Sequence, residues 1–333
     1  MRGPDVRTLV TGGCGFIGSH FVKRLAARGA DIVVLDKLTY SGNRANLEGV
    51  PHEFVCGDIA DAAAVRRAGE GCATIVNLAA ESHVDRSILA AGDFIRTDIA
   101  GTHVLLEWVR KTSVRLVQVS TDEVYGDLAR GEAACEDDPL RPSSPYSASK
   151  AGADLLILAY VRTYGVDAVI TRGSNTYGPF QYPEKMIPLF VTNALDGEPL
   201  PVYGDGRQRR DWLHVDDHCA AIETVLKKGE TGGVYNVGAG DERENLDVTR
   251  MIIELTGAHP SLVRHVEDRP GHDRRYALDS SRIRALGWKP KRTFEEGLAE
   301  TVKWYSENRA WWEPLKAGEY RAYYARQYDE RLG

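Results

Sequence analysis

Short apolar runs rich in β-branched residues alternate with longer segments of helical periodicity through the first half of the chain. Strands buried on both faces of a parallel sheet give such continuous apolar runs, and helices connect them. Strands are expected at residues 6–11, 31–36, 52–56, 74–79, 114–120 and 167–171, and helices at 17–27, 93–110 and 148–164. The pattern therefore predicts an α/β fold with a doubly wound parallel sheet.

The pattern changes after residue 176, where prolines and glycines become frequent and the expected elements become shorter. We predict a sheet domain over residues 1–176 and a smaller, mixed α/β lobe over residues 177–333 that covers a substrate, with the chain free to cross between them. No segment has the composition of a linker, so the two parts are expected to share one continuous interface.

A glycine-rich segment follows the first expected strand and reads Thr11-Gly12-Gly13-Cys14-Gly15-Phe16-Ile17-Gly18. Glycines allow a tight turn and let backbone NH groups approach a pyrophosphate at a helix N-terminus. Asp36, at the end of the second strand, can accept hydrogen bonds from both ribose hydroxyls of NAD and would repel the 2′-phosphate of NADP. The segment predicts a Rossmann domain that binds NAD; the alternative is a structural turn with a solvated Asp36. Asp58 and Ile59, after the third strand, suit the adenine edge or an ordinary turn.

Tyr146 and Lys150 lie four residues apart at the start of an expected helix, so phenol and ammonium share one face. A nearby cation stabilises phenolate and lowers the pKa of a tyrosine, which would make Tyr146 a base near neutral pH. Surface helices contain such pairs by chance. The position of this pair, after a dinucleotide loop and behind the fifth strand, favours a catalytic interpretation.

Two adjacent carboxyl residues, Asp122 and Glu123, follow the fifth strand. The carboxyl ends of strands in an open α/β sheet face the ligand crevice. One interpretation is a helix-capping Asp beside a solvated Glu. The functional interpretation is an acid/base couple in which one carboxyl is protonated and the other ionised. Thr121 can donate or accept a hydrogen bond beside the tyrosine.

Composition excludes several classes of protein. The 333 residues suit two domains, and the net charge of −6 argues against a nucleic-acid-binding protein. No apolar run reaches the roughly 18–20 residues of a membrane span, and the N-terminus lacks the pattern of a signal peptide. Five scattered cysteines indicate reduced thiols rather than disulfides or a metal site. We expect a cytoplasmic protein with no metal and with neither nucleic acid nor membrane as partner.

Taken in order, the glycine loop, Asp36, the run Ser120-Thr121-Asp122-Glu123-Val124-Tyr125-Gly126 and the run Tyr146-Ser147-Ala148-Ser149-Lys150 resemble the extended short-chain dehydrogenase/reductase family. More narrowly, the chain is similar to the dTDP-glucose 4,6-dehydratases within that family. Segments 78–87, 183–189, 203–218 and 268–272 extend the similarity over nearly the whole chain. The Asp-Glu pair is the distinguishing element, because similar sugar-nucleotide epimerases usually carry small or polar residues there.

The resemblance implies conversion of dTDP-glucose to dTDP-4-keto-6-deoxy-glucose and water, a step toward deoxysugars, with NAD held tightly and recycled within each turnover. It assigns Tyr146, helped by Lys150 and Thr121, to the proton of the C4 hydroxyl. It assigns Glu123 to the C5 proton and Asp122 to protonation of the departing C6 oxygen.

Further contacts are implied by the resemblance alone. For the cofactor these are Gly12, Gly15, Phe16, Ile17, Gly18, Asp36, Lys37, Leu38, Thr39, Asp58, Ile59, Leu78, Ala79, Ala80, Ser82, Thr97, Tyr146, Lys150 and Thr176. For the substrate they are Ser82, Thr121, Asn175, Lys185, Met186, Ile187, Pro188, Leu189, Pro201, Val202, Tyr203, Arg210, Asn245, Asp268, Arg269, Pro270, Gly271 and His272. Tyr203 would stack on the pyrimidine or serve the core, and His272 could equally be an exposed loop residue. Gly173 and Thr176 depart from the Cys and Asn that many dehydratases carry.

Other interpretations stay open. The same Tyr/Lys/NAD core would serve a nucleotide-sugar epimerase, a decarboxylase or a UDP-sugar 4,6-dehydratase, and a noncatalytic NAD-binding regulator would not need all four of Tyr146, Lys150, Asp122 and Glu123. The helices at 93–110 and 148–164 resemble a pair that forms a four-helix dimer interface in the family, so a homodimer is expected. Their apolar residues would equally serve an intrachain core; these are Ile99, Val104, Leu105, Trp108, Leu155 and Leu158.

Overall fold

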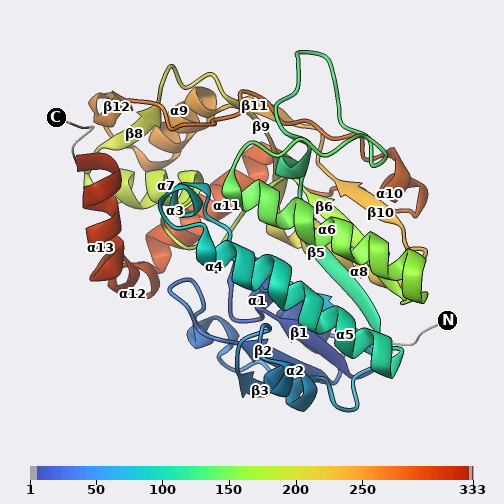
Figure 1. The fold of residues 1–333 in the computed structure, drawn as a ribbon. Helices are drawn as coiled ribbons and strands as arrows, with labels where there is room; N and C mark the ends of the chain where they lie inside the picture. The colour runs from blue at the N-terminus through green and yellow to red at the C-terminus, as the bar shows by residue number, and fades with distance from the viewer. Residues whose placement is uncertain (1–5, 330–331, 333) are drawn as a thin grey trace.

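A seven-stranded parallel sheet forms the larger domain in the computed structural model, which describes residues 6–329 and 332. Figure 1 shows helices packed against this sheet. Its strands, in spatial order, are β10 (Val234–Val237), β6 (Ala168–Gly173), β5 (Arg115–Thr121), β4 (Thr74–Asn77), β1 (Thr8–Thr11), β2 (Ile32–Asp36) and β3 (Glu53–Cys56). All neighbouring strands pair in parallel. The prediction of a doubly wound parallel sheet is confirmed. The outer ends of the predicted domains, at residues 1–5, 330, 331 and 333, lie outside the described residues.

Helices cover both faces of this sheet because alternate strand residues point to opposite sides. On one face, α1 (Phe16–Ala26) and α8 (Val215–Lys228) pack against strand residues such as Val10 and Val34. On the other face, α2 (Ala62–Gly69), α5 (Thr102–Thr112) and α6 (Pro145–Tyr164) pack against residues such as Leu9 and Val33. The strands are therefore buried on both sides, as their continuous apolar runs predicted.

The expected helix at 93–110 is helical from Gly92 to Thr112 but not uniformly α-helical. It begins as the short α4 (Gly92–Phe94), continues as the π-helical turn η2 (Ile95–Gly101) and ends as α5. A further short helix, α3 (Val84–Leu89), precedes it. Residues Thr97 and Asp98 of the π-helical turn are both buried.

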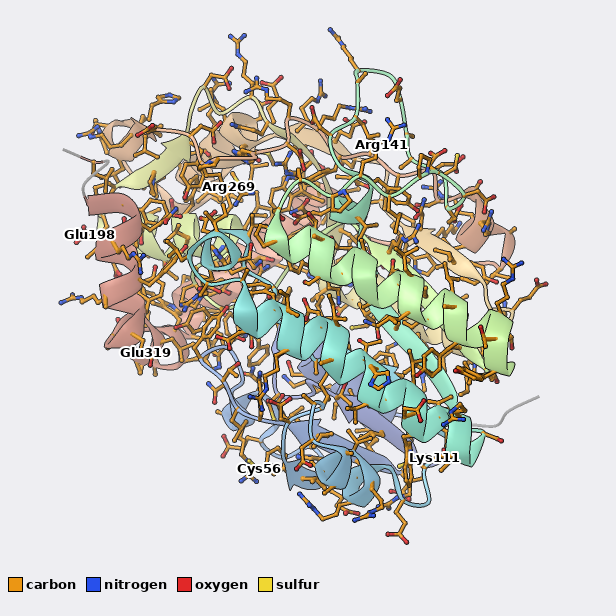
Figure 2. The ribbon with its side chains drawn as sticks, in the orientation of Figure 1. Cys56, Lys111, Arg141, Glu198, Arg269 and Glu319 are labelled. Carbon is orange, nitrogen blue, oxygen red and sulfur yellow. The ribbon has the colours of Figure 1, made fainter. Side chains whose placement is uncertain are left out.

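The smaller lobe has its own apolar core, built mainly on α7 (Met186–Asp196), α9 (Asn245–Thr256) and α11 (Phe294–Glu307). The lobe also contains two small sheets. One consists of β7 (Asn175–Tyr177), β9 (Arg209–His214) and β11 (Glu242–Glu244). The other consists of β8 (Leu200–Tyr203) and β12 (Val263–Val266). The remaining elements are α10 (Ser281–Ala285), α12 (Arg309–Trp312), α13 (Glu319–Tyr324), η1 (Arg44–Leu47), η3 (Asp122–Tyr125), η4 (Pro260–Leu262), η5 (Pro314–Lys316) and η6 (Ala325–Asp329). Figure 2 places Arg269 in this lobe and Cys56 at the opposite, sheet end of the molecule.

The chain returns to the sheet domain after entering the smaller lobe. Helix α8 packs beside α1, and β10 adds the outermost strand next to β6. A domain boundary at residue 176 stays a prediction, with α8 and β10 as segments that cross back. Among the described residues, no helix is long and apolar enough to cross a membrane.

Candidate active site

The glycine loop between β1 and α1 packs so closely that side chains would not fit. Gly12 has a φ of 67°, and a Cβ placed on it would lie 2.6 Å from the backbone N of Ala79. A Cβ on Gly18 would lie 2.1 Å from the carbonyl oxygen of Gly12. The loop therefore brings the backbone of α1's first turn to the carboxyl end of the sheet, where its NH groups can meet an anion.

Asp36 closes one side of the loop. Its carboxylate accepts hydrogen bonds from the backbone N of Cys14 (2.9 Å) and of Leu38 (2.8 Å). Burial raises the pKa of Asp36, and these two hydrogen bonds oppose that shift. Asp36 is thereby fixed in the lining of a cavity that the glycine loop also lines.

That cavity is lined by many residues predicted to bind the cofactor, namely Gly12, Gly15, Asp36, Lys37, Thr39, Asp58, Ile59, Leu78, Ala79, Ala80 and Thr97. Residues not predicted also line it, namely Leu35, Ser41, Gly42 and Gly57. The predicted residues outside this lining are Phe16, Ile17, Gly18, Leu38, Ser82, Tyr146, Lys150 and Thr176.

The side chains of this cavity fit the dinucleotide expected from the sequence. Lys37 donates to Thr97 Oγ1 (2.9 Å) and pairs with Glu81 (3.2 Å), so its ammonium is already neutralised beside the cavity. A 2′-phosphate next to Asp36 would meet a buried carboxylate, and the neighbouring Lys37 is already paired with Glu81. The glycine cradle and Asp36 together fit NAD better than NADP.

The predicted catalytic pair, Tyr146 and Lys150, lies in the first turns of α6, and the N-terminus of this helix is capped. Ser144 and Ser147 form a reciprocal capping box, and Pro145 occupies the first helical position. Lys150 Nζ donates to the carbonyl oxygen of Val119 (2.8 Å) at the end of β5. This contact draws the pair to the carboxyl end of the strand that leads to Thr121, Asp122 and Glu123.

The prediction that a nearby cation lowers the pKa of the Tyr146 phenol is wrong. Burial raises the pKa of the Tyr146 phenol well above its ordinary value, and the charge of Glu123 adds to that rise, while a hydrogen bond with Thr121 opposes it. The ammonium of Lys150 is engaged with a backbone carbonyl, and sequence spacing gives no sign of this contact.

The two carboxyl groups after β5 lie in η3, where Thr121 caps the turn. Thr121 Oγ1 accepts from the backbone N of Glu123 (3.2 Å) and donates to Asp122 Oδ1 (3.1 Å). Burial, followed by the charge of Glu123, raises the pKa of Asp122 well above its ordinary value. Asp122 Oδ2 is buried without a partner among the described residues. A protonated Asp122 is thus available as an acid.

Glu123 has different surroundings. Burial raises its pKa, but the positive charges of Arg269, Lys185 and Arg210 act in the opposite direction. Of the predicted catalytic residues, only Glu123 lines the second cavity; Asp122, Thr121, Tyr146 and Lys150 lie outside its lining. This contrast supplies one carboxyl for each role of an acid/base couple.

The second cavity lies between the sheet domain and the smaller lobe. Predicted substrate residues line it, namely Asn175, Lys185, Met186, Leu189, Pro201, Val202, Tyr203, Arg210, Asn245, Arg269 and His272. Those outside the lining are Ser82, Thr121, Ile187, Pro188, Asp268, Pro270 and Gly271. Ile187, for example, faces the apolar core of the smaller lobe.

Residues that sequence reasoning missed also line this cavity, namely His83, Val84, Asp85, Glu184, Phe190, Trp212 and Tyr328. His83 to Asp85 and Glu184 lie within segments 78–87 and 183–189, which carried the resemblance, so these residues could have been predicted from the sequence. Tyr328 comes from η6, far along the chain, and its approach depends on tertiary folding that no local pattern encodes.

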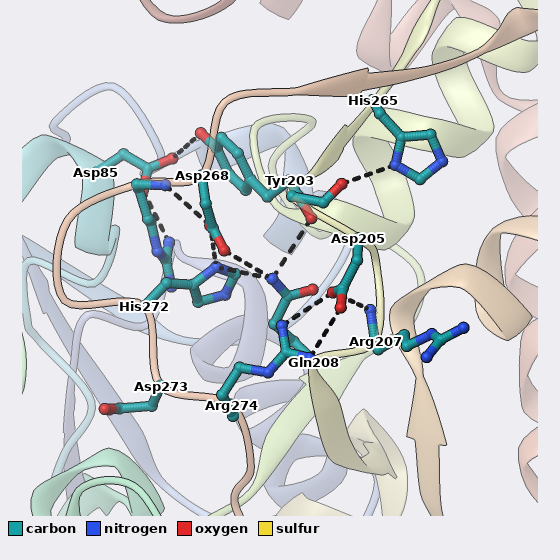
Figure 3. A network of polar contacts seen from close by, with 12 residues as sticks. Asp85, Tyr203, Asp205, Arg207, Gln208, His265, Asp268, His272, Asp273 and Arg274 are labelled. Carbon is teal, nitrogen blue, oxygen red and sulfur yellow. Dashed lines mark hydrogen bonds and ion pairs between the residues drawn. The ribbon is translucent and has the colours of Figure 1, made fainter.

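A polar network orders one end of this cavity (Figure 3). Asp85 accepts from the Tyr203 hydroxyl (2.9 Å) and from Arg269 (2.8 Å), and Arg269 holds the pKa of Asp85 down at about 2 despite burial. His272 Nδ1 lies 2.6 Å from Asp268 Oδ1, and its side chain is only 5% exposed. The alternative of an exposed loop histidine is therefore wrong.

The cavity offers suitable groups for a nucleoside diphosphate. Arg210, Arg269 and Lys185 supply positive charge, and guanidinium groups match phosphate oxygens. Asn175 Oδ1 and Asn245 Oδ1 are buried without partners among the described residues. Buried polar atoms without partners are rare and indicate a missing ligand group or water.

Gly173 and Thr176, the two residues that depart from the family pattern, both lie next to the side chain of His218. A Cβ on Gly173 would lie 2.6 Å from His218 Cε1, and Thr176 Oγ1 lies 2.8 Å from His218 Nδ1. Gly173 thus makes room for the imidazole that Thr176 contacts. Thr176 is turned toward His218 rather than into the cofactor cavity.

Comparison with known proteins agrees with this geometry. The family model described as GDP-mannose 4,6 dehydratase matches residues 9–301. The chain therefore belongs to this family of extended short-chain dehydrogenases/reductases.

Within that family the chain is similar to proteins named dTDP-glucose 4,6-dehydratase. It is 52% identical to the one from Streptomyces niveus, over 94% of this chain and 96% of that protein. The crystal structure of DesIV, a dTDP-glucose 4,6-dehydratase from Streptomyces venezuelae with NAD and TYD bound, has a TM-score of 0.91 and 53% identity, covering 93% of this chain and 100% of that one. The UDP-glucose 4-epimerase of Thermus thermophilus, with NAD, has a TM-score of 0.86 and 36% identity, covering 91% and 99%.

Proposed function

We propose that this protein is a dTDP-glucose 4,6-dehydratase that uses tightly bound NAD and releases dTDP-4-keto-6-deoxy-glucose and water. The observation that carries the proposal is the pair Asp122 and Glu123 at the end of β5, beside Tyr146 and the cavity lined by Lys185, Arg210 and Arg269. The names of the most similar relatives support the same activity.

The glycine loop and Asp36 would hold NAD, which would supply an acceptor for the C4 hydride and, once reduced, a donor for C6, so the cycle would need no external oxidant. In the oxidation, Tyr146 accepts the proton of the C4 hydroxyl, with Thr121 as its hydrogen-bonding neighbour. Tyr146 can accept this proton only as a phenolate, and because burial disfavours the phenolate, the ionised fraction of Tyr146 limits the oxidation as the pH falls.

The two carboxyl groups then act in the elimination. A 4-keto group acidifies the C5 hydrogen, and Glu123, whose ionised form the three cations favour, accepts that proton. Asp122 has a raised pKa, so it carries the proton that the C6 oxygen needs in order to leave as water. Glu123 then returns its proton to C5 as the hydride arrives at C6, so that one water is the net loss. An epimerase has no use for this second acid, which is why the pair favours dehydration.

The experiment that tests this function is incubation of the purified protein with dTDP-glucose, followed by mass spectrometry of the sugar nucleotide. We expect a product lighter by one water. A parallel incubation with UDP-glucose tests the choice of base. An isomer of unchanged mass would indicate an epimerase, and a substrate recovered intact in both reactions would refute the proposal.

We further propose a cytoplasmic homodimer. All five cysteines are free thiols, which suits a reducing compartment. Of the apolar residues singled out for an interface, Leu105 is buried in the sheet domain's core, whereas Leu155 on α6 is 58% exposed. Ile95, in the neighbouring η2 turn, is 55% exposed. Large exposed apolar side chains on adjoining helices are typical of an interaction surface.

A further inference from the structure

Asp98 is a buried carboxyl group that has no role in the chemistry described so far. It lies in the π-helical turn η2 and is 2% exposed. Its carboxylate contacts Ser149 Oγ (2.6 Å) on α6 and accepts from the backbone N of Glu81 (3.2 Å). Single π-helical turns are frequent at functional sites, and Asp98 lies in one.

Ser149 lies between Tyr146 and Lys150 on the same turn of α6. Its hydroxyl is 2.6 Å from Asp98 Oδ2 and 2.8 Å from the carbonyl oxygen of Tyr146. A hydroxyl has only one hydrogen to donate. When Asp98 is ionised, Ser149 donates to it; when Asp98 is protonated, Asp98 can donate and Ser149 is free to donate to Tyr146. The hydrogen bonding of the catalytic turn therefore follows the protonation of Asp98.

The charged groups around Asp98 come from several elements. Lys150 of α6 favours its ionised form, and Glu81, from the segment between β4 and α3, opposes it. The pKa of Glu81, which burial raises, is in turn lowered by the charge of Lys37 and raised by that of Asp93. On α5, His103 is exposed and packs against Tyr160. Burial is the largest influence and raises the pKa of Asp98 to about 6.

The same π-helical turn reaches the cofactor cavity. Thr97, next to Asp98, accepts a hydrogen bond from Lys37 and lines the cavity of the glycine loop. One turn of helix thus contacts the cofactor cavity through Thr97 and the catalytic turn through Asp98. The negative charge of Asp98 also disfavours ionisation of Tyr146.

We propose that Asp98 is a positioning residue that orients the Tyr146–Lys150 turn through Ser149 and whose charge sets the pH range in which Tyr146 can accept a proton. The inference rests on the proposed function, because it concerns the first proton transfer of that reaction. Asp98 itself lines neither cavity.

The test is Asp98→Asn, a neutral side chain of the same shape that can still accept from Glu81 and donate to Ser149. With bound NAD reduced by dTDP-glucose in a single turnover, we expect the acid limb of the rate–pH profile to move to lower pH by about one unit, because Tyr146 loses a negative neighbour. The KM for dTDP-glucose should change less than about twofold, since only the proton transfer is affected. Asp137→Asn is the matched control and should leave the profile in place, because Asp137 is 86% exposed and pairs with Arg282.

A second measurement does not depend on activity. The pKa of Asp98 is about 6 in the folded protein and about 3.9 in an unfolded chain, so its ionisation costs folding stability as the pH rises through that interval. The urea midpoint of Asp98→Asn relative to wild type should therefore increase between about pH 4 and about pH 6.5 and stay constant above that. If the wild type fails to reduce NAD with dTDP-glucose, the proposed function is wrong, while this measurement still reports on Asp98.

Superimposable pH profiles for Asp98→Asn and wild type would overturn the proposal. Should Asp98→Asn fail to fold, Ser149→Ala provides the test. Without the serine hydroxyl, the ionised form of Asp98 loses a donor, so Asp98 stays neutral over a wider range and the acid limb should again move to lower pH. An unmoved limb in that folded variant would also overturn the proposal.

Discussion

Asp122 and Glu123 are adjacent in the chain but have different charged groups around them, and this difference can be tested. In Asp122→Asn and Glu123→Gln, the first oxidation should survive, because Tyr146 and Lys150 are intact. NADH absorbance should appear on adding dTDP-glucose, whereas product formation should fall by about 10²–10⁴-fold. Exchange of solvent deuterium at C5 should drop most in Glu123→Gln.

Tyr146→Phe is the matching control, since it should remove the early NADH signal. Two carboxylate variants that made product at nearly the wild-type rate would show the pair to be structural.

At this scale the sequence predicted which residue types gather at the end of β5. It did not predict the direction in which the pKa of Tyr146 shifts, because that depends on burial and on the charges of Glu123 and Asp98.

The loop from β1 to α1 carries the next prediction, which concerns cofactor retention. Purified protein should contain NAD without supplementation, and Gly12→Ala should lose most of it, because the new Cβ would lie 2.6 Å from Ala79 N at a φ of 67°. Denaturing the protein and assaying the supernatant for NAD and NADP measures this.

Gly29→Ala is the matched control. Gly29 has a φ of 74° with nothing near its missing Cβ, so the substitution brings similar backbone strain but no collision beside the cofactor cavity. NAD content should then match the wild type. A full complement of NAD in Gly12→Ala, or NADP as the main bound nucleotide, would contradict the assignment of this loop and Asp36.

Elements with strong local periodicity were predictable, as α1, α6 and the first six strands show. The π-helical turn η2 was not, because one extra residue in a turn barely changes the apolar spacing. Strands β8 and β12 were not predictable either. They pair in parallel although they lie about 60 residues apart, and the local sequence of one strand does not indicate its partner.

Assembly is the prediction at the scale of the whole molecule. Light scattering should give twice the 36.8 kDa chain mass, and Leu155→Glu should give the chain mass, because a charge would be buried in the proposed interface. Leu255→Glu is the control: this leucine is 43% exposed, on α9 of the other lobe, and the dimer should persist. A wild type that scatters as a single chain would refute the interface.

The return of the chain to the sheet at α8 and β10 restricts how such a protein can be cut and recombined. A fragment ending at residue 176 would lack the helix that covers β5 and β6 and the strand that pairs with the β6 edge. Bare apolar faces and open strand edges favour aggregation. The substrate lobe is therefore not a contiguous cassette, and a chimera that exchanges it must leave residues 215–237 with the sheet and replace the flanking segments separately.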